Sequence, residues 1–254
     1  MNFLGSLAEQ ALGLAQLRKV SAELSAEHPT APAFSQAALQ RFGVQWEVGE
    51  QGLKALREVS GPCLVLANHP VGGREALLLH EVLSSAREDY RILSNRVLGS
   101  IEAVRTKLIL VDPFGGQSAT AMNQRPLREA WRYVAQGGLL GVFPAGEVSY
   151  WQKAEGRVAD KPWAPQVARL ALATGATVVP LFFKAQSSLA LRSLAFVHPV
   201  LKTPLLPREL MHGPARQIKA TLGAPIPASQ ISRFEDPEGL AAWLREQVYA
   251  LDRG

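Results

Sequence analysis

His69 and Glu75 form the pair of side chains in this sequence that is best suited to acid–base chemistry. An apolar run ends at Ala67, the chain turns through Pro70 and two glycines, and a helical pattern follows. We therefore expect His69 at the tip of a strand and Glu75 in the first turn of the next helix. A carboxylate that binds one imidazole nitrogen fixes the tautomer and leaves the other nitrogen free to accept a proton. The alternative is a structural histidine that a local backbone group satisfies.

A histidine base of this kind suits the transfer of an acyl group from a thioester to an alcohol. An alcohol has too high a pKa to attack a thioester quickly, so removal of its proton during the attack is the help that it needs. No covalent enzyme intermediate is then required. His69 is the candidate general base, and Glu75 is the candidate partner that orients and charges it.

A second candidate stretch, Phe143-Pro144-Ala145-Gly146-Glu147, also lies where a strand is expected to end. Backbone amides around Gly146 could stabilise charge on a thioester oxygen or bind the headgroup of an acceptor. Glu147 either binds a cationic amine of a substrate or caps a following helix.

Two weaker signals accompany these stretches. The strand exit from Leu110 to Gly116 contains Asp112 and Phe114 and, taken alone, would be an ordinary turn. Aromatic residues surround the second stretch and either line an acyl groove, anchor the site in a lipid interface, or pack in the core. For at least two of them we expect core packing; they are Trp131, Tyr150, Trp151 and Trp163.

Other kinds of site find no support in the sequence. Cys63 lies inside an apolar run and is expected to pack in the core, and not to act as a nucleophile. The sequence has no Gly-x-Ser-x-Gly elbow, no phosphate-binding loop and no dinucleotide-binding glycine motif. The remaining histidines lack carboxylate or cysteine partners at ligand spacing, so no metal is expected; they are His28, His80, His198 and His212.

The elements that position these residues alternate between strand and helix. Apolar runs predict strands at Cys63–Ala67, Tyr90–Leu93, Leu108–Val111, Leu139–Phe143 and Thr177–Phe183. Helical patterns lie between them at Glu75–Arg87, Arg125–Gln136 and Trp163–Thr174. We therefore predict an α/β fold with a mostly parallel central sheet of six or seven strands, flanked by helices, whose reactive residues gather at the carboxyl ends of the strands. Towards the end of the chain, an edge strand is expected at Gln217–Leu222 and a closing helix at Pro237–Leu251.

The first 42 residues read as a helical N-terminal segment. Apolar residues recur at helical spacing from Met1 to about Glu27, and a second short helix follows to about Phe42. This amphipathic pair either lies on a bilayer or packs on the core of its own domain. No linker divides the sequence, so we expect one domain over residues 1–254, with the core motifs in residues 61–183.

Composition limits the partners. The chain has 254 residues, 47% of them hydrophobic and 19% charged, which is typical of a folded globular protein. It lacks a secretory signal and an apolar stretch long enough to span a membrane, and its single cysteine fits a reducing compartment. The net charge of +5 suits anionic surfaces such as lipid headgroups or an acidic carrier protein. No run of basic residues favours nucleic acid.

Taken together, the strand-end stretches resemble the lysophospholipid (glycerophospholipid) acyltransferase superfamily. In that family an Asn-His motif ends in an acidic residue and a Phe-Pro-x-Gly motif follows, as Asn68-His69 and Phe143-Pro144-Ala145-Gly146 do here. Val178–Phe183 is similar to a further block of the family, and the agreement covers roughly residues 61–183. The tail from Ser187 to Leu210 is similar to a bacterial branch labelled hemolysin-like, which includes acyltransferases linked to ornithine lipids and other amino-acid lipids.

The sequence also departs from the family pattern. The common motif has Asp where this chain has Arg74, whereas a branch with His-Pro-x-Gly has its acidic residue one place later, at Glu75. Glycerol-phosphate enzymes of the family have arginines at the positions of Pro113 and Val148, and a glutamate at Ala145. Those arginines are thought to hold the phosphate of the acceptor. Their loss indicates an acceptor other than a simple glycerol phosphate.

The resemblance implies an O-acyltransferase that uses acyl-carrier protein or acyl-CoA as donor and a lyso-lipid or amino-acid lipid as acceptor, without a cofactor. It is expected in the cytoplasm, on the inner face of the cytoplasmic membrane. Substrate binding is expected from Asn68, Asp112, Phe114, Phe143, Pro144, Gly146 and Glu147. The alternatives are a non-catalytic relative that binds lipid or a carrier protein and, less favoured, a thioester hydrolase.

Overall fold

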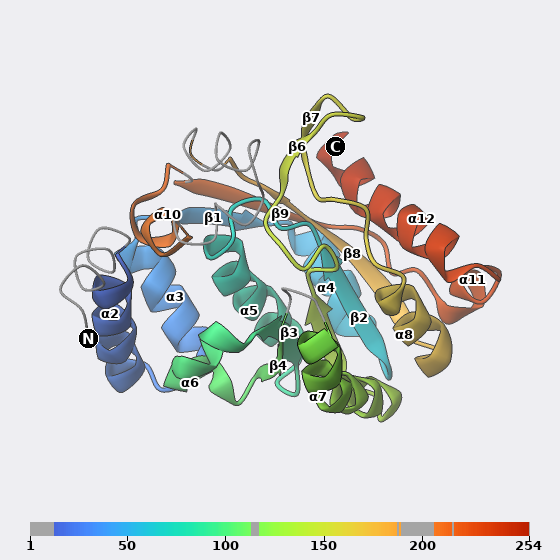
Figure 1. The fold of residues 1–254 in the computed structure, drawn as a ribbon, viewed down its shortest axis with the longest axis horizontal. Coiled ribbons are helices and arrows are strands. Elements are labelled where there is room, and N and C mark those ends of the chain that lie inside the picture. Colours follow the sequence, from blue (N-terminus) through green and yellow to red (C-terminus); the bar gives the residue numbers. More distant parts are fainter. Residues whose placement is uncertain (1–12, 113–116, 187, 189–205, 215, 254) are drawn as a thin grey trace.

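A seven-stranded sheet lies at the centre of the protein, which is described here from a computed structural model (Figure 1). The structure describes residues 13–112, 117–186, 188, 206–214 and 216–253. The strands of the central sheet are β1 (Gln45–Val48), β2 (Cys63–Ala67), β3 (Arg91–Asn95), β4 (Leu108–Val111), β5 (Leu139–Val142), β8 (Thr177–Lys184) and β9 (Gln217–Leu222). A separate hairpin consists of β6 (Tyr150–Gln152) and β7 (Arg157–Ala159).

The strands follow the order β1-β9-β8-β2-β5-β3-β4, and every neighbouring pair is parallel except β8 and β9. β9 and β1 therefore run opposite to the other strands. A strand in the middle of a parallel sheet is covered on both faces, which explains why every residue of β2 is buried. This arrangement confirms the expected α/β fold with a mostly parallel central sheet.

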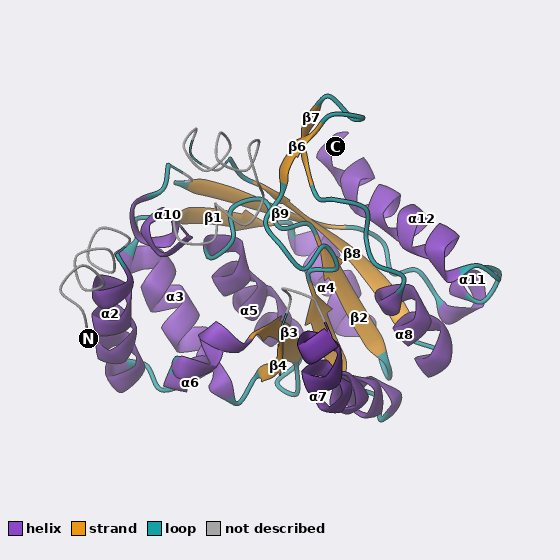
Figure 2. Cartoon of the chain, viewed as in Figure 1, coloured by secondary structure: helices purple, strands orange, loops and turns teal. Residues whose placement is uncertain are grey.

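Helices cover both faces of the sheet and produce a separate apolar core on each (Figure 2). Because side chains alternate along a strand, Cys63 and Val65 enter one core while Leu64 and Leu66 enter the other. The first core includes residues of α3 (Ala31–Arg41), α4 (Glu50–Glu58) and α5 (Arg74–Ala86). The second includes residues of α7 (Gln117–Ala135), α8 (Gln166–Thr174) and α12 (Pro237–Ala250).

The remaining helices lie around this framework. They are α2 (Leu14–Glu27), α6 (Glu102–Arg105), α10 (Leu206–His212) and α11 (Ala228–Ile231), with short 3-10 helices at Arg96–Ser100 and Leu251–Arg253. Among the helices of the described ranges, none combines the length and the apolar character that a membrane span needs.

The described part of the N-terminal segment packs on the protein's own core. Phe34 and Leu39 of α3 and Leu24 of α2 belong to the first apolar core, and Leu17 and Val20 pack against it. For residues 13–42 the structure therefore favours core packing over the alternative of a helix pair lying on a bilayer.

The position of β9 corrects one prediction. Gln217–Leu222 forms a strand, as expected, but β9 lies between β8 and β1 and is not at the edge. The edge strand on that side of the sheet is β1, whose four residues are exposed or only half-buried. A strand this short and polar has no apolar run, and sequence patterns therefore missed it.

Two predicted helices begin elsewhere. Arg125–Gln136 was expected to start beside Pro126, a residue favoured in a first turn, but α7 starts at Gln117 and runs through that proline. Asn123 anchors the earlier half of α7, because its side chain exchanges two hydrogen bonds with the main chain of Asp112, both 2.7 Å. The helix expected from Trp163 starts only at Gln166, after Pro165.

Candidate active site

His69 follows β2 at the carboxyl edge of the sheet, between the ends of β5 and β8. The strand registers pair Leu66 with Val142 and Ala67 with Leu181. The loop after β2 therefore meets the residues that end the two neighbouring strands. The predicted location of His69, at the tip of a buried strand, is confirmed.

Glu75 lies in the first turn of α5 and turns its carboxylate back towards His69. The distance from Nδ1 of His69 to Oε1 of Glu75 is 3.1 Å, and the Glu75 side chain is fully buried. The backbone N–H groups of Val71 and Gly72 each donate to the same Oε1 at 2.7 Å. The short turn between strand and helix thus wraps around the carboxylate and fixes it beside the imidazole.

The electrostatics of Glu75 favour the charged form. Burial raises the pKa of a carboxyl group, but here the contact with His69 and the N–H groups of Gly72 and Val71 outweigh burial, so the pKa lies below its ordinary value. The contact between the two side chains has the length of a hydrogen bond but a bent angle. Catalytic hydrogen bonds in ligand-free enzymes are commonly of this kind and tighten when substrate binds.

Phe143, the residue after β5, packs flat against the His69 ring. The two ring centroids are 4.2 Å apart and the planes differ by 25°. Phe183 of β8 lies on the far side of Phe143, with 6.3 Å between their ring centroids. Glu75 therefore holds the edge of the imidazole and Phe143 its face, while 15% of the His69 side chain remains exposed. Because Nδ1 of His69 faces Glu75, Nε2 is the ring nitrogen left for a substrate.

Asn68 links the loop after β2 to β8. Its Nδ2 donates to the carbonyl of Phe183 at 3.0 Å, and its Oδ1 accepts from the N–H of Phe183 at 2.7 Å. The residue is only 3% exposed. Both polar atoms of the side chain thus hold the loop after β2 against β8, and the expected role in substrate binding stays a prediction.

The two glycines after Val71 are explained by the close approach of other segments. Gly72 has a φ of +100°, and a Cβ there would lie 2.9 Å from side-chain atoms of Leu206 and Val148. A Cβ on Gly73 would lie 2.9 Å from the side chain of Leu210, which also belongs to α10. The turn that carries the histidine is thus covered by α10.

Arg74, the departure from the family motif, supports the same contact. It is 1% exposed, and its Nε donates to the main-chain carbonyl of Leu210 at 2.8 Å. Burial lowers the pKa of Arg74, and the neighbouring Arg216 lowers it further. The guanidinium therefore fastens α10 to the turn, and the acidic partner of the histidine comes from Glu75.

The stretch after Phe143 is close to His69, but two expectations about it change. The N–H of Gly146 donates to the carbonyl of Phe143 at 3.0 Å, so this amide is already used in a turn. Glu147 forms an ion pair with Lys161, at 2.8 Å between Oε1 and Nζ. The proposed helix-capping role of Glu147 is wrong, because the segment that follows is strand β6. Pro144 is half-buried at the start of this turn.

Asp112 is not brought beside His69. It follows β4, the third strand from β2 on that side of the sheet, which at ordinary strand spacing is about 14 Å away. Its main chain binds Asn123, as described above. Phe114 lies outside the described residues.

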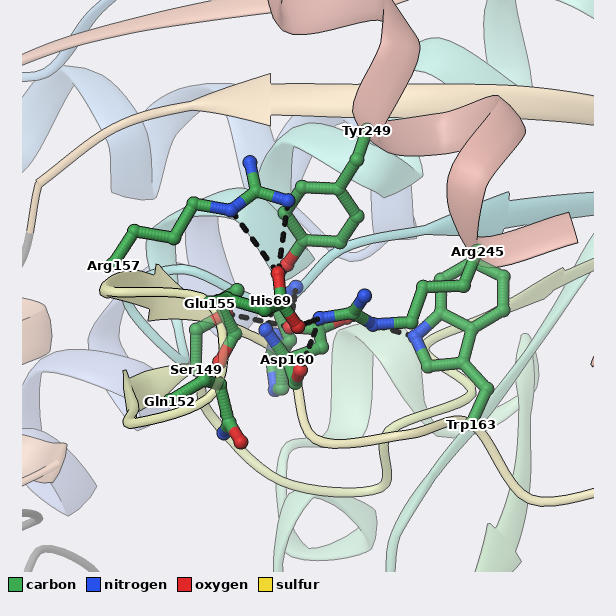
Figure 3. A network of polar contacts seen from close by, with 10 residues as sticks. His69, Ser149, Gln152, Glu155, Arg157, Asp160, Trp163, Arg245 and Tyr249 are labelled. Atoms are coloured by element: carbon green, nitrogen blue, oxygen red, sulfur yellow. Dashed lines mark hydrogen bonds and ion pairs between the residues drawn. The ribbon is translucent and has the colours of Figure 1, made fainter. Parts of the chain in front are cut away.

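Asp160 is the residue of this site that sequence reasoning missed. Its fully buried carboxylate accepts hydrogen bonds from the main-chain N–H of His69 at 3.2 Å and from the hydroxyl of Ser149 at 2.5 Å (Figure 3). Trp163 donates its indole N–H to the same carboxylate at 3.0 Å. Asp160 is 91 residues from His69 in sequence and belongs to no recognisable motif, so no local signal pointed to it.

The four aromatic residues around the second stretch are less buried than expected. Trp163 is 5% exposed, but Trp131 and Trp151 are 39% and 41% exposed, and Tyr150 is half-buried. Core packing of at least two of the four is therefore wrong. Trp151 lies on the β6–β7 hairpin, where its cross-strand neighbour is Val158 and a two-stranded ribbon leaves one face uncovered.

Cys63 is confirmed as part of the core, and His80 is buried as well. Cys63 is fully buried, and burial raises the pKa of its thiol to about 12. His80 is 5% exposed and hydrogen-bonds the hydroxyl of Tyr90 at 3.0 Å, and burial lowers its pKa to about 3. Neither group is available as a nucleophile or base at neutral pH.

Comparisons with known proteins agree with this arrangement. Residues 24–249 match the model of a family described as acyltransferase. The chain is similar to the lyso-glycine lipid O-acyltransferase of Phocaeicola vulgatus, with 24% identity over 225 residues that cover 86% of this chain and 77% of the relative. It is also similar to the crystal structure of the 1-acyl-sn-glycerophosphate (LPA) acyltransferase, PlsC, from Thermotoga maritima, with a TM-score of 0.58, 17% identity, and coverage of 99% of this chain and 88% of that chain. At 17% identity, the second likeness concerns the fold alone.

Proposed function

The chain belongs to the acyltransferase family that its residues 24–249 match, and we propose that it moves a fatty acyl group from a thioester to a hydroxyl of a lipid. The observation that carries this proposal is the pair of His69 and Glu75. The pair combines a partly exposed imidazole with a fully buried carboxylate 3.1 Å from its Nδ1. This is the geometry that a general base needs, because the carboxylate fixes the ring and stabilises the imidazolium.

The direction of proton transfer in the reaction follows from which ring nitrogen of His69 is free. Nδ1 faces Glu75, so Nε2 takes the proton of the acceptor hydroxyl as its oxygen attacks the thioester carbonyl carbon. The tetrahedral intermediate then collapses, and the carbon–sulfur bond breaks. The imidazolium returns the proton to the departing sulfur, so the products are an ester and a free thiol. Glu75 stays ionised throughout, because its pKa lies below the ordinary value.

We further propose that the acceptor is a lyso-lipid with an amino-acid headgroup. The similarity to a lyso-glycine lipid O-acyltransferase supports this choice. So does the packing at two positions where the resemblance places a glutamate and an arginine in glycerol-phosphate enzymes. Ala145 is 2% exposed and Val148 is 3% exposed, and Val148 lies against Gly72. These positions fill space in the protein and offer no charge to a phosphate.

Acyl-carrier protein or acyl-CoA is the proposed donor, and no cofactor is proposed beyond it. Both donors are anionic, and the net charge of +5 favours their approach. We also propose that the protein acts at a membrane surface, where its lipid acceptor resides. The exposed Trp151 on the hairpin next to the site supports this, because indole rings favour the interface between lipid and water.

A thiol-release assay tests the proposal. The purified protein is incubated with long-chain acyl-carrier protein or acyl-CoA, with and without a lyso-lipid, and free thiol is measured. The lyso-lipid carries either an amino-acid or a glycerol-phosphate headgroup. We expect release that depends on the amino-acid lyso-lipid, with an ester product in the mass spectrum. His69→Ala should reduce the rate about 10²–10⁴-fold, and His28→Ala, at the junction of α2 and α3, serves as the matched histidine control.

The same assay separates the alternatives. Release of thiol without any acceptor would indicate a hydrolase. No release with either donor and any acceptor, combined with retention on lipid vesicles, would indicate the non-catalytic lipid-binding relative. Release that depends on the acceptor but persists in His69→Ala would remove His69 from its role as base while leaving the acyl transfer intact.

A further inference from the structure

The main chain of His69 is held on both sides by the two ends of the β6–β7 hairpin. On one side its N–H donates to Oδ1 of Asp160 at 3.2 Å, and on the other its carbonyl accepts from the N–H of Ser149 at 2.8 Å. The hydroxyl of Ser149 closes the arrangement by donating to the same Oδ1 at 2.5 Å. Residues that precede and follow the hairpin therefore converge on the main chain of one residue, the proposed base.

Asp160 is itself fastened from several directions (Figure 3). Its Oδ2 accepts from the indole N–H of Trp163 at 3.0 Å. Its main-chain N–H donates to the hydroxyl of Tyr249 at 2.7 Å, and its carbonyl accepts from Arg245 at 2.6 Å. Tyr249 and Arg245 belong to α12, so a helix near the C-terminal end of the chain holds Asp160 in place.

We propose that Asp160 is a positioning residue of this site, whose buried carboxylate sets the backbone of His69 and so aims the imidazole at the acceptor hydroxyl. The inference rests on the proposed function of His69 as base. Asp160 acts through the main chain, since its bond is to the N–H of His69 and Glu75 occupies the ring nitrogen. Without this hold, the ring would keep its contact with Glu75 but lose its direction relative to the substrate.

The cost of burying this acid supports a specific role. A fully buried carboxylate is unfavourable unless hydrogen bonds compensate it, and a packing role would be served better by an apolar residue. Burial raises the pKa of Asp160, and the donors from Ser149, Trp163 and the main chain of His69 offset this only in part. All three donors point at one carboxylate. One of them belongs to His69 itself, and another belongs to Ser149, which directly precedes the hairpin.

The replacement Asp160→Asn isolates this role. An asparagine keeps one oxygen that can accept from the N–H of His69 and from Ser149, but its Nδ2 would face the indole N–H of Trp163. Two donors then oppose each other, and the side chain has to shift. We expect kcat to fall about tenfold to a hundredfold, because a shift of the order of 1 Å in a catalytic group costs about that much. KM for either substrate should change little.

Two controls make the comparison specific. Asp89→Asn is the same substitution at an exposed aspartate that pairs with Arg87 between α5 and β3, at the opposite edge of the sheet, and it should keep the parent kcat. Ser149→Ala removes the hydroxyl bond to Asp160 but retains the N–H bond to His69, so its effect should be smaller than that of Asp160→Asn.

A spectroscopic measurement distinguishes positioning from general destabilisation. The imidazole signals of His69 are observed in histidine-labelled protein by NMR and assigned by their loss in His69→Ala. In folded Asp160→Asn we expect displaced imidazole signals of His69, because the main-chain hold from Asp160 is changed. The His69 signals of Asp89→Asn should superimpose on those of the parent protein.

The outcomes separate this inference from the proposed function. Unchanged His69 signals and an unchanged kcat in folded Asp160→Asn would overturn the positioning role. If the parent protein transferred no acyl group to any acceptor, the proposed function would fail. Displaced His69 signals would then still support the hold of Asp160 on His69, and unchanged signals would refute it.

Discussion

Oε1 of Glu75 lies 3.1 Å from Nδ1 of His69, and it also accepts the N–H groups of Val71 and Gly72. One oxygen thus contacts both the imidazole ring and the turn that connects His69 to α5. The residue that follows Gly73 in the common family motif is an acid, but here Arg74 faces α10 and the longer side chain of Glu75 reaches the histidine. A carboxylate one place later along the helix therefore contacts the histidine.

Glu75→Gln should lower kcat by about a hundredfold or more and leave KM nearly unchanged. The amide oxygen can still accept from Val71 and Gly72, but the side chain no longer carries the charge that stabilises the imidazolium. Steady-state thiol release checks this. Glu75→Asp retains the charge at a greater distance from His69, so its kcat should lie between those of the parent protein and Glu75→Gln. A Gln variant as fast as the parent would show that the carboxylate is not needed.

The difference in stability between the parent protein and Glu75→Gln should change with pH in one direction, and the difference between the parent and Asp160→Asn in the other. The pKa of Glu75 is lowered in the folded state, so its contribution is present above its ordinary value of about 4.3 and is lost as the pH falls through the folded pKa. The pKa of Asp160 is raised, so its contribution is present below about 3.9 and is lost as the pH rises through the folded pKa.

Urea unfolding at a series of pH values measures both effects. As the pH is lowered from 7, the stability advantage of the parent over Glu75→Gln should shrink below about pH 4.3. Its stability relative to Asp160→Asn should instead improve. Equal pH slopes for the two differences would contradict the opposite shifts.

Asn68→Ala should destabilise the protein by about 2–4 kcal/mol, because it leaves the buried N–H and carbonyl of Phe183 without partners. Asn123→Ala is the matched control. It breaks the same double hydrogen bond to a main chain, at Asp112, but in a part-buried position where water can replace the lost partner. Its cost should be about 1 kcal/mol. Chemical denaturation would refute the burial argument if the two losses were equal.

Trp151→Ala should weaken binding to lipid vesicles about tenfold, whereas Trp131→Ala should bind as the parent does. The two indoles are almost equally exposed, at 41% and 39%. They lie far apart, since the β6–β7 hairpin and α7 are at opposite sides of the view in Figure 1. Co-sedimentation with vesicles of phosphatidylglycerol and phosphatidylcholine measures the difference. Equal loss in both variants would point to a general apolar effect and not to a lipid-facing hairpin.

Local sequence determined the strands of the sheet centre and the core of the site. The apolar runs of β2 and β4 predicted both strands with their observed bounds. For β2 the reason is that a strand buried on both faces has no polar positions. His69 and Glu75 are joined by one strand-to-helix turn, so residue types and spacing were sufficient to predict their contact. The predicted resemblance to the acyltransferase superfamily rests on the same local motifs, and the match of residues 24–249 to the family model agrees with it.

Tertiary structure alone decided the contacts between residues distant in the chain. Asp160 reaches His69 across 91 residues, and its role depends on where α12 and the β6–β7 hairpin lie. Asn68 reaches Phe183 across 115 residues and links the loop after β2 to β8. The exposure of Trp151, the interior place of β9 and the separation of Asp112 from His69 depend on the order of strands in the sheet. Local propensities do not contain that order, because it is set by the burial of one element against another.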